Sequence, residues 1–430
     1  MRYLPPASIG GTGLFTTIKK CAPAWLQERA AKHKRLGVLA LNLVTCCVAM
    51  QVSSIAARDF TLSIVARTGD SIAGHTIQYL GSPAINNRGL IVFTARFSDI
   101  PAPECPGVAA TALCTSAIVA GRSLLVMTGS AIAGHTLTWI SDPVALNEAG
   151  TVAFAAGTRA LDKRAGQHAI FTQNQLIAKP VDIVDGCEIS QIGYSESVLL
   201  DPRPFIDNVG HVFFSANPVR PCRGGAIVSN VFTQRHAVSF DGKSAGYFGV
   251  SGTGLAGALT DSGIYSQRGL ILRYRARIEG HVVDGFGPPA INDAGRIAFA
   301  GQFDCSPSGC LNAVAREHHL IAKAGDMGGV TVTEFWTPVI NNRDVVAFRG
   351  LVGPDNVNFL LFSTELGVIA KPGDNDIITS KTLQTVGRPV IAGYMGLNDD
   401  GCVVFEATFT DGSQAIVLAT PVKRFHAALK

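Results

Sequence analysis

Two loops of nearly identical sequence carry the side chains best suited to bind a ligand. They read Thr68-Gly-Asp70-Ser-Ile-Ala-Gly-His75 and Thr128-Gly-Ser130-Ala-Ile-Ala-Gly-His135. A third histidine, His281, follows a glycine at nearly the same distance before a later copy of the segment that comes next. Aspartate and histidine side chains arranged around a ring would surround a ligand or a cation with polar groups.

The same residues also have a purely structural interpretation. An aspartate can close a turn through its own backbone, and a histidine can pack or hydrogen-bond locally in each repeat. Ser130 replaces the aspartate in the second loop, which argues against an obligatory carboxylate. Repetition is typical of structural residues, whereas catalysis usually needs one asymmetric group. Both interpretations apply to the candidate ligand-binding residues, which are Asp70, His75, His135, Trp139, His281, Asp326, Trp336 and Asp374.

Two tryptophans are the remaining candidates for ligand binding, and the common catalytic motifs are missing from the sequence. Trp139 and Trp336 precede a proline in comparable loops, where they would be carbohydrate-stacking platforms or packing between repeats. The sequence has no nucleophile elbow, H-E-x-x-H or P-loop motif, and no cysteine pair has C-x-x-C spacing. We therefore predict no catalytic residue, metal site or cofactor, although a structural calcium at a Gly-Asp loop is an alternative.

The elements that position these loops come from an internal repeat. A hairpin pattern, Pro-x-x-Asn-x-x-Gly-x-x-x-Phe, predicts two strands around a turn in which the Asn bonds its own backbone and the Gly takes a positive φ. Its copies begin at Pro83, Pro143, Pro204, Pro289, Pro338 and Leu397, the third with Asp207 for Asn. A second predicted hairpin follows the first five copies, at 117–126, 169–179, 231–240, 313–323 and 359–371. A further hairpin is predicted at 264–272, and the last copy is followed by a single strand, 415–418.

Two hairpins make a four-stranded antiparallel unit of about fifty residues, which buries both faces only by stacking on its neighbours. We therefore predict an all-β chain folded as a β-propeller with seven four-stranded blades, six being the alternative. In the fourth blade only the 264–272 hairpin is clear, so its inner strands are expected within 241–258. The strand 60–67 should join the last strand, 415–418, and close the ring.

This repeat resembles the TolB-type propeller repeat, whose equivalent turn is usually Ser-Pro-Asp-Gly. With its continuation Ala-Lys-x-Gly-Asp, at 322–326 and 370–374, it is similar to a family of exported bacterial tandem-repeat proteins of unknown function. The resemblance covers roughly residues 60–420 and implies an architecture rather than a chemistry. The family often carries a C-terminal sorting tail. This sequence ends at 425–430 without an apolar anchor, so we do not expect sorting by that route.

The first 57 residues have the composition of an export signal, and residues 58–430 are expected to form the single propeller domain. Seven basic residues and one acidic residue precede residue 58, and Leu36–Met50 is apolar. Small residues at Ser54 and Ala56 fit a cleavage site, although an uncleaved membrane anchor is an alternative. The rest of the chain carries 29 basic and 31 acidic residues, a balance that argues against nucleic acid as a partner.

The cysteines agree with a periplasmic or extracellular location. Cys105 with Cys114, and Cys305 with Cys310, are close pairs whose disulfides would clamp the connections between two strands. Cys187 and Cys222 would pair only if the fold joins them. Cys402 is left over within an apolar strand, where we expect a buried thiol.

The leading functional hypothesis is an exported, monomeric, non-catalytic propeller that binds a protein or an extracellular polymer. The alternative is a hydrolase or lyase acting on polysaccharide at the channel mouth, since propellers host both kinds of function. The distribution of polar residues among the blades would distinguish the scaffold from the enzyme. An enzyme should gather unlike groups from two or three blades, whereas a scaffold should show equivalent residues around the ring.

Overall fold

The computed structural model describes residues 60–100, 114–158, 168–184, 187–192, 204–214, 216–218, 235–238, 244–248, 263–266, 269–353, 358–374, 383–386 and 396–422. Over these residues the regular elements are all β-strands, paired antiparallel. Asp59–Lys430 form one compact unit. No helix long and apolar enough to span a membrane occurs in the part of the chain that the structure describes.

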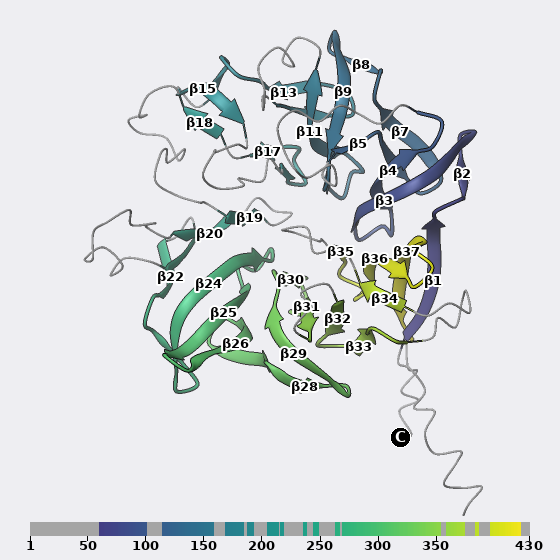
Figure 1. Ribbon diagram of the computed structural model, residues 1–430. Coiled ribbons are helices and arrows are strands. Elements are labelled where there is room, and N and C mark those ends of the chain that lie inside the picture. Colours follow the sequence, from purple (N-terminus) through teal and green to yellow (C-terminus); the bar gives the residue numbers. More distant parts are fainter. Residues whose placement is uncertain are drawn as a thin grey trace, which may run out of the picture. The chain divides into compact units, whose positions relative to one another are not determined.

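The described strands form eight sheets, which we number along the chain as seven groups by taking the two small sheets of residues 183–218 together (Figure 1). Group 1 contains β2 (Ser71–Ile72), β3 (His75–Ile85), β4 (Ile91–Phe97), β6 (Ala117–Ala120) and β7 (Ser123–Met127). Group 2 contains β5 (Cys114–Thr115), β8 (Ala131–Ile132), β9 (His135–Ser141), β10 (Ala145–Leu146), β11 (Val152–Thr158), β12 (Ala169–Thr172) and β13 (Leu176–Ala178). Group 3 contains β14 (Ile183–Val184), β15 (Cys187–Ile192), β16 (Phe205–Ile206), β17 (Val212–Phe213) and β18 (Ala216–Pro218), in two small sheets.

The later groups repeat the pattern with longer strands. Group 4 contains β19 (Arg235–Val238), β20 (Ser244–Phe248), β21 (Gly263–Ser266) and β22 (Gly269–Arg273). Group 5 contains β23 (Arg277–Ile278), β24 (His281–Ile291), β25 (Ile297–Ser306), β26 (Gly309–Arg316) and β27 (His319–Lys323). Group 6 contains β28 (Gly325–Met327), β29 (Val330–Phe335), β30 (Val339–Ile340), β31 (Val346–Val352), β32 (Asn358–Ser363) and β33 (Gly367–Ala370). Group 7 contains β34 (Leu383–Val386), β35 (Gly396–Leu397), β36 (Val403–Phe409), β37 (Gln414–Pro421) and β1 (Phe60–Arg67).

The first strand completes the last group, as the sequence predicted. β1 pairs antiparallel with β37 from Phe60 opposite Pro421 to Arg67 opposite Ala415. Without β1, the outer edge of β37 would present unpaired backbone N–H and C=O groups. The two ends of the repeat are therefore joined within one sheet.

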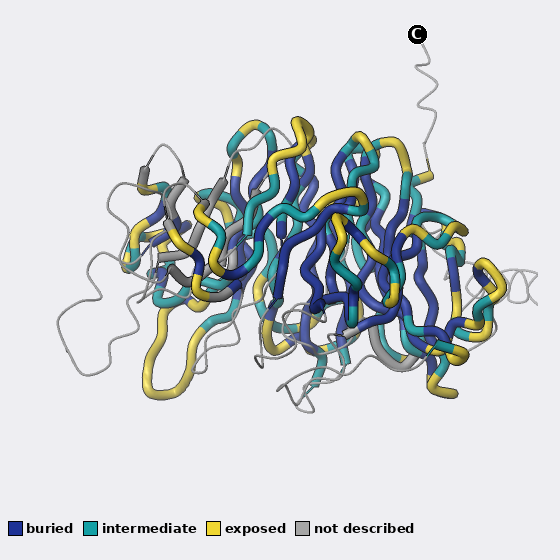
Figure 2. Tube along the Cα trace, turned by 90° about the horizontal axis from the view of Figure 1, so that it is seen from above, coloured by how far each residue is buried: buried dark blue, intermediate teal, exposed yellow. Residues whose placement is uncertain are grey.

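Apolar residues from consecutive groups meet in shared cores. The phenylalanine that ends each repeat pattern is almost fully buried in five copies, at Phe93, Phe154, Phe299, Phe348 and Phe405. One core joins groups 7 and 1, the next joins groups 1 and 2, and others join groups 5 and 6 and groups 6 and 7. Figure 2 shows the buried strands between exposed turns. Since each group buries a face only against its neighbour, the arrangement is propeller-like.

The fourth group corrects one sequence-based assignment. The stretch 231–240 was expected to supply the outer hairpin of the third unit. Instead, β19 at Arg235–Val238 pairs with β20 and begins group 4. β20 does fall within the stretch 241–258 where an inner strand was expected. The polar residues Arg235 and His236 were expected to form a turn, but they lie in β19, and residues 231–234 lie outside the described chain.

Candidate functional site

The asparagine turns of successive groups are hydrogen-bonded to one another. In each turn the Asn oxygen accepts backbone N–H groups of its own turn, as Asn86 Oδ1 does from Arg88 and Leu90 at 3.1 and 3.0 Å. Its amide nitrogen donates to the backbone oxygen of the equivalent residue in the next group. The donor–acceptor pairs are Asn86 to Asn147, Asn147 to Asp207, Asn292 to Asn341, Asn341 to Asn398, and Asn398 to Asn86, at 2.9–3.3 Å.

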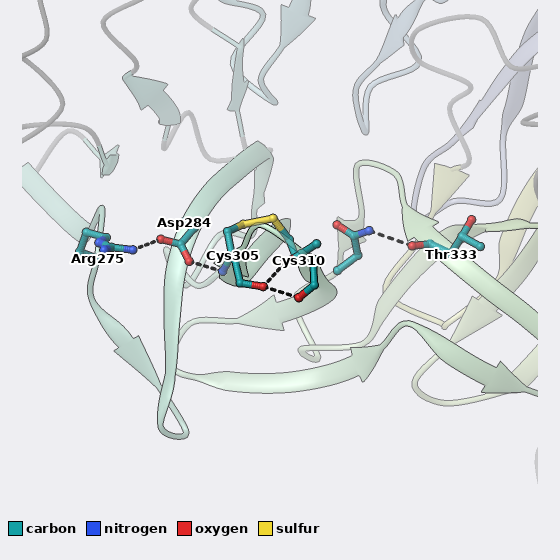
Figure 3. Close-up of a disulfide and its surroundings, with 9 residues drawn as sticks. Arg275, Asp284, Cys305, Cys310 and Thr333 are labelled. Atoms are coloured by element: carbon teal, nitrogen blue, oxygen red, sulfur yellow. Dashed lines mark hydrogen bonds and ion pairs between the residues drawn. A yellow bond between two sulfur atoms is a disulfide. The ribbon is translucent and has the colours of Figure 1, made fainter.

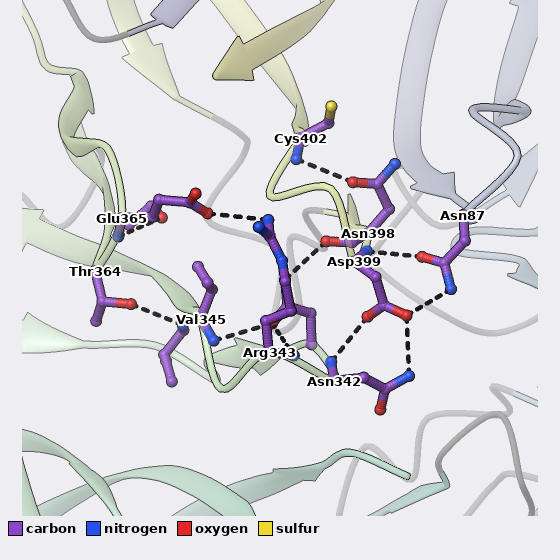
Figure 4. Close-up of polar contacts among 12 residues, drawn as sticks. Asn87, Asn342, Arg343, Val345, Thr364, Glu365, Asn398, Asp399 and Cys402 are labelled. Carbon is purple, nitrogen blue, oxygen red and sulfur yellow. Dashed lines mark hydrogen bonds and ion pairs between the residues drawn. The ribbon is translucent and has the colours of Figure 1, made fainter. Parts of the chain in front are cut away.

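A second series of bonds runs beside the first, through the residue after each Asn. The backbone N–H of Asn342 donates to Asp399 Oδ1 at 2.8 Å, and that of Asp399 donates to Asn87 Oδ1 at 2.7 Å. Asp399 Oδ2 also accepts the amide groups of Asn87 and Asn342 (Figure 4). We call these two series the asparagine belt. The belt connects group 7 to group 1, so it joins the two ends of the repeat a second time, in addition to the pairing of β1 with β37.

The Gly-Asp loops are built as local turns. Asp70 Oδ2 accepts the N–H of Arg67 at 3.0 Å, and Asp374 Oδ2 accepts the N–H of Lys371 at 3.2 Å. Asp182 makes the same contact with Lys179 at 2.9 Å, in a loop that the sequence search did not single out. Asp326 differs, because it lies in β28 and accepts the N–H of Gly329. The sequence-predicted aspartates thus bond to their own backbone, which is the structural role considered for them.

The predicted histidines lie at the starts of their strands, and two of them form equivalent pairs with aspartates. His75 Nδ1 lies 2.7 Å from Asp99 Oδ2, and His281 Nδ1 lies 2.5 Å from Asp304 Oδ2. Asp99 follows β4, and Asp304 lies near the end of β25, so the end of the second strand lies on the same face as the start of the first. The histidine hydrogen bonds lower the pKa of both aspartates. His135 contacts the ring of Phe171, and the connection that would face it, 159–167, lies outside the described residues.

The two tryptophans differ in exposure, since Trp139 is buried and Trp336 is partly exposed. Trp139 is inside β9 and only 4% exposed, with its ring edge-on to His168 at 4.8 Å. Gly157 leaves room for it, since a Cβ there would lie 2.0 Å from Trp139 Nε1. Trp336 directly follows β29 and packs against Phe359. Sequence spacing suggested comparable loops, but the first tryptophan belongs to a strand and is not accessible as a stacking platform.

His168 is a buried histidine that the sequence did not mark. Desolvation lowers its pKa to about 4, so it is neutral at pH 7. Its Nδ1, Trp139 Nε1 and Thr158 Oγ1 are buried and have no hydrogen-bond partner among the described residues. A neutral imidazole beside a tryptophan contributes packing more than charge at this position.

Among the cysteines whose side chains the structure describes, two are bonded to each other and one is free. Cys305 in β25 and Cys310 in β26 are bonded, as predicted, across the turn that joins the two strands (Figure 3). Asp284 braces this turn by accepting the N–H of Cys305 at 2.7 Å and by pairing with Arg275. Cys402 is free but half-buried, because it lies in the asparagine turn before β36 and not within the strand as expected. Burial raises the pKa of its thiol.

The other predicted cysteine pairs cannot be followed in the structure. Cys105 and Cys222 lie outside the described residues, which leaves both the Cys105–Cys114 and the Cys187–Cys222 pairings as predictions. Within the described ranges no three histidine, cysteine, aspartate or glutamate side chains converge as metal ligands would.

Arg349 is the most unusual polar residue in the described chain, and the sequence search missed it. It is 3% exposed, within β31, and its guanidinium lies over the rings of Phe359 and Trp336 at 4.9 and 5.8 Å. Desolvation lowers its pKa to about 10, and the charge of Glu406 partly opposes that shift. The sequence did contain a sign of this residue. An arginine follows Phe348, whereas the residue that follows Phe93, Phe154 and Phe299 is small.

One family model matches part of the chain. The model of a family of unknown function, DUF7453, matches residues 45–230. No curated protein sequence matches this chain. The TolB-type relationship therefore stays a prediction from the repeat pattern.

Solved structures resemble the chain only distantly. A protein of unknown function from Dyadobacter fermentans DSM 18053 is 10% identical with a TM-score of 0.33, covering 83% of this chain and 98% of that one. A gluconolactonase from Xanthomonas campestris is 10% identical with a TM-score of 0.30, covering 86% and 92%. A lectin from Aleuria aurantia is 6% identical with a TM-score of 0.30, covering 79% and 92%. These similarities are too low to transfer an activity.

Proposed function

We propose that this chain is an exported β-propeller of seven blades that acts as a non-catalytic binding scaffold in the periplasm or outside the cell. The seven strand groups correspond to the seven blades, and β1 with β37 closes the ring. The Cys305–Cys310 disulfide fits an oxidising compartment. The leader, 1–57, would direct export.

One observation carries the binding function. On the face where the Gly-Asp loops meet the ends of the second strands, the polar residues recur in equivalent places with equivalent partners. The pairs His75–Asp99 and His281–Asp304 are the clearest case, and both remain partly exposed. A repeated surface of this kind suits a protein or an extracellular polymer that contacts several blades, whereas catalysis requires unlike groups at one point.

The experiment compares two double variants of the purified, oxidised protein. His75→Ala/His281→Ala removes the repeated pairs from the proposed face, and His211→Ala/His318→Ala removes two exposed histidines that lie in hairpin turns after the first and third strands. Partners are captured quantitatively from the periplasmic or secreted fraction, and a panel of polysaccharides is tested for both binding and cleavage. We expect one partner or polymer to be retained by wild type and the control and lost by the first variant.

Different outcomes would contradict different parts of this proposal. New reducing ends or unsaturated products from a polysaccharide would replace the scaffold with the hydrolase or lyase. Equal retention by both variants would exclude this face as the binding surface. A rise in the unfolding midpoint with calcium that EDTA reverses would instead support a calcium-stabilised module.

A further inference from the structure

Arg349 breaks the repeat at a position where the other groups are small or uncharged, with one exception. The residue after the buried phenylalanine of the second strand is Thr94 in group 1, Ala155 in group 2, Ala300 in group 5 and Glu406 in group 7. A feature required by the fold of each group would recur in each group. Arg349 therefore needs a cause of its own.

The described side chains around Arg349 are apolar. On β31 it stands between Ala347 and Leu351 on the face that packs against group 7, because alternate residues of a strand share a face. Phe359 and Trp336 cover its guanidinium. Group 6 thus places a cation inside a hydrophobic core.

Several donors in this core have no acceptor. Arg349 Nε and Nη1 and Trp336 Nε1 are buried, and no described residue accepts a hydrogen bond from them. The aromatic rings attract the cation but accept none of these hydrogen bonds. A buried charged donor left without an acceptor is among the most unfavourable arrangements in a protein interior.

Glu406 does not fill this role. Its oxygen Oε1 accepts from Gln414 Nε2 at 2.7 Å, and Gln414 Oε1 in turn accepts the N–H of Leu80. This chain of bonds runs from group 7 to group 1, on the opposite face of β36 from the core that contains Arg349, as the neighbouring Val404 and Phe405 show. Glu406 acts on Arg349 through its charge, but it accepts no hydrogen bond from Arg349 Nε or Nη1.

We propose that Arg349 and Trp336 bind a compact monovalent anion between groups 6 and 7, of the size of chloride or formate. Such an ion would accept the buried guanidinium and indole N–H groups together and neutralise the charge. A halide and a small carboxylate share this chemistry. Trp336 is partly exposed, so the site has an edge near solvent. The site is separate from the proposed binding face and does not depend on it.

The indole N–H signals of the purified protein provide a test without any substitution. The chain has three tryptophans, and Trp139 is a matched internal control because its Nε1 is also buried and unpartnered but lies beside the neutral His168. The signals are assigned with Trp336→Phe and Trp139→Phe, and chloride or formate is titrated at constant ionic strength with sulfate as the balancing salt. We expect a saturable shift of the Trp336 signal and an unchanged Trp139 signal.

Thermal unfolding gives the second measurement. At a hundredfold excess over its Kd, the bound ion should raise the midpoint by about 3 °C in a chain of this size. Arg349→Met should abolish the rise, and Arg343→Met should keep it, since Arg343 is half-exposed in the same group and already paired with Glu365. If Arg349→Met fails to fold, the titration of the wild-type indole still decides.

The outcomes separate the possible occupants. Saturation with chloride alone identifies a halide site, and saturation with formate identifies a site for a small carboxylate. Either supports the proposal. No saturable shift with either ion, or the same drift of both tryptophans, would mean that ordinary water satisfies these donors and would overturn it.

Discussion

The asparagine belt can be tested by replacing one donor while leaving its acceptor intact. Asn341→Asp keeps the oxygen that accepts the N–H groups of Arg343 and Val345, but it removes the amide that donates to the backbone oxygen of Asn398. Asn341 is 4% exposed, so water cannot replace this bond easily. The substitution changes a few atoms and leaves the shape of the turn unaltered.

The expected cost follows from these contacts. Loss of one intramolecular hydrogen bond costs about 1 kcal/mol, and a buried carboxylate oxygen facing a carbonyl oxygen adds about as much again. The free energy of unfolding should therefore fall by about 2 kcal/mol. For a chain of this size the midpoint measured by calorimetry should drop by about 2–3 °C.

The pH dependence of the stability loss tests whether the new carboxylate causes it. The introduced carboxyl would have a folded pKa above its unfolded value, because its charged form is the unfavourable one here. Its destabilising effect should therefore be complete above that folded pKa and shrink toward about pH 3–4, where the protonated group can donate again.

Asp207 provides the control, since the third turn already has an aspartate at this position. Its carboxylate accepts the N–H of Val209 and of His211, and His211 Nδ1 lies 3.0 Å from its second oxygen. Asp207→Asn should change the free energy of unfolding by less than about 0.5 kcal/mol, because its local acceptor is retained. Equal stability of Asn341→Asp and wild type, or an equal loss in Asp207→Asn, would refute the belt as a stabilising element.

Two further predictions concern buried histidine and the disulfide. Burial lowers the pKa of His168 to about 4, so the unfolded chain binds an extra proton between that value and about pH 6.5. Stability should fall by roughly 3 kcal/mol as the pH drops through this window, and His168→Phe should remove that part of the slope in calorimetric scans at pH 7 and pH 5. Cys305→Ser/Cys310→Ser should cost about 2 kcal/mol or less, since the closed loop is short, with no further loss on adding reductant.

The repeat made much of the fold predictable from the sequence. The Asn-x-x-Gly turn signals located the hairpins because the Asn oxygen and the left-handed Gly act within the turn itself. Gly89 and Gly401 have φ values of 77° and 80°. Asp344 takes the same conformation at 63° in the copy that lacks Gly. Local geometry of this kind leaves a local pattern that a sequence can show.

Interactions between groups were harder to anticipate. The belt depends on the second nitrogen of each Asn reaching a turn about fifty residues away. The sequence explained Asn through its own turn, where Asp would serve equally well, and only the inter-group bond accounts for the preference for Asn. The aspartate–histidine pairs were likewise missed, because Asp99 and Asp304 lie 24 and 23 residues from their partners.

Repetition makes some residues prominent and hides others when a site is sought. The loops with Asp70 and His75 were prominent because they recur, yet recurrence is what a structural role produces when one unit is copied. Arg349 was overlooked for the opposite reason, since it appears once, within an apolar strand that otherwise matches its neighbours. In a repeat protein the informative comparison is therefore between equivalent positions. Arg349 departs from its counterparts, is buried at an energetic cost and has donors without a hydrogen-bond acceptor among the described residues. The fold alone does not explain a residue of this kind.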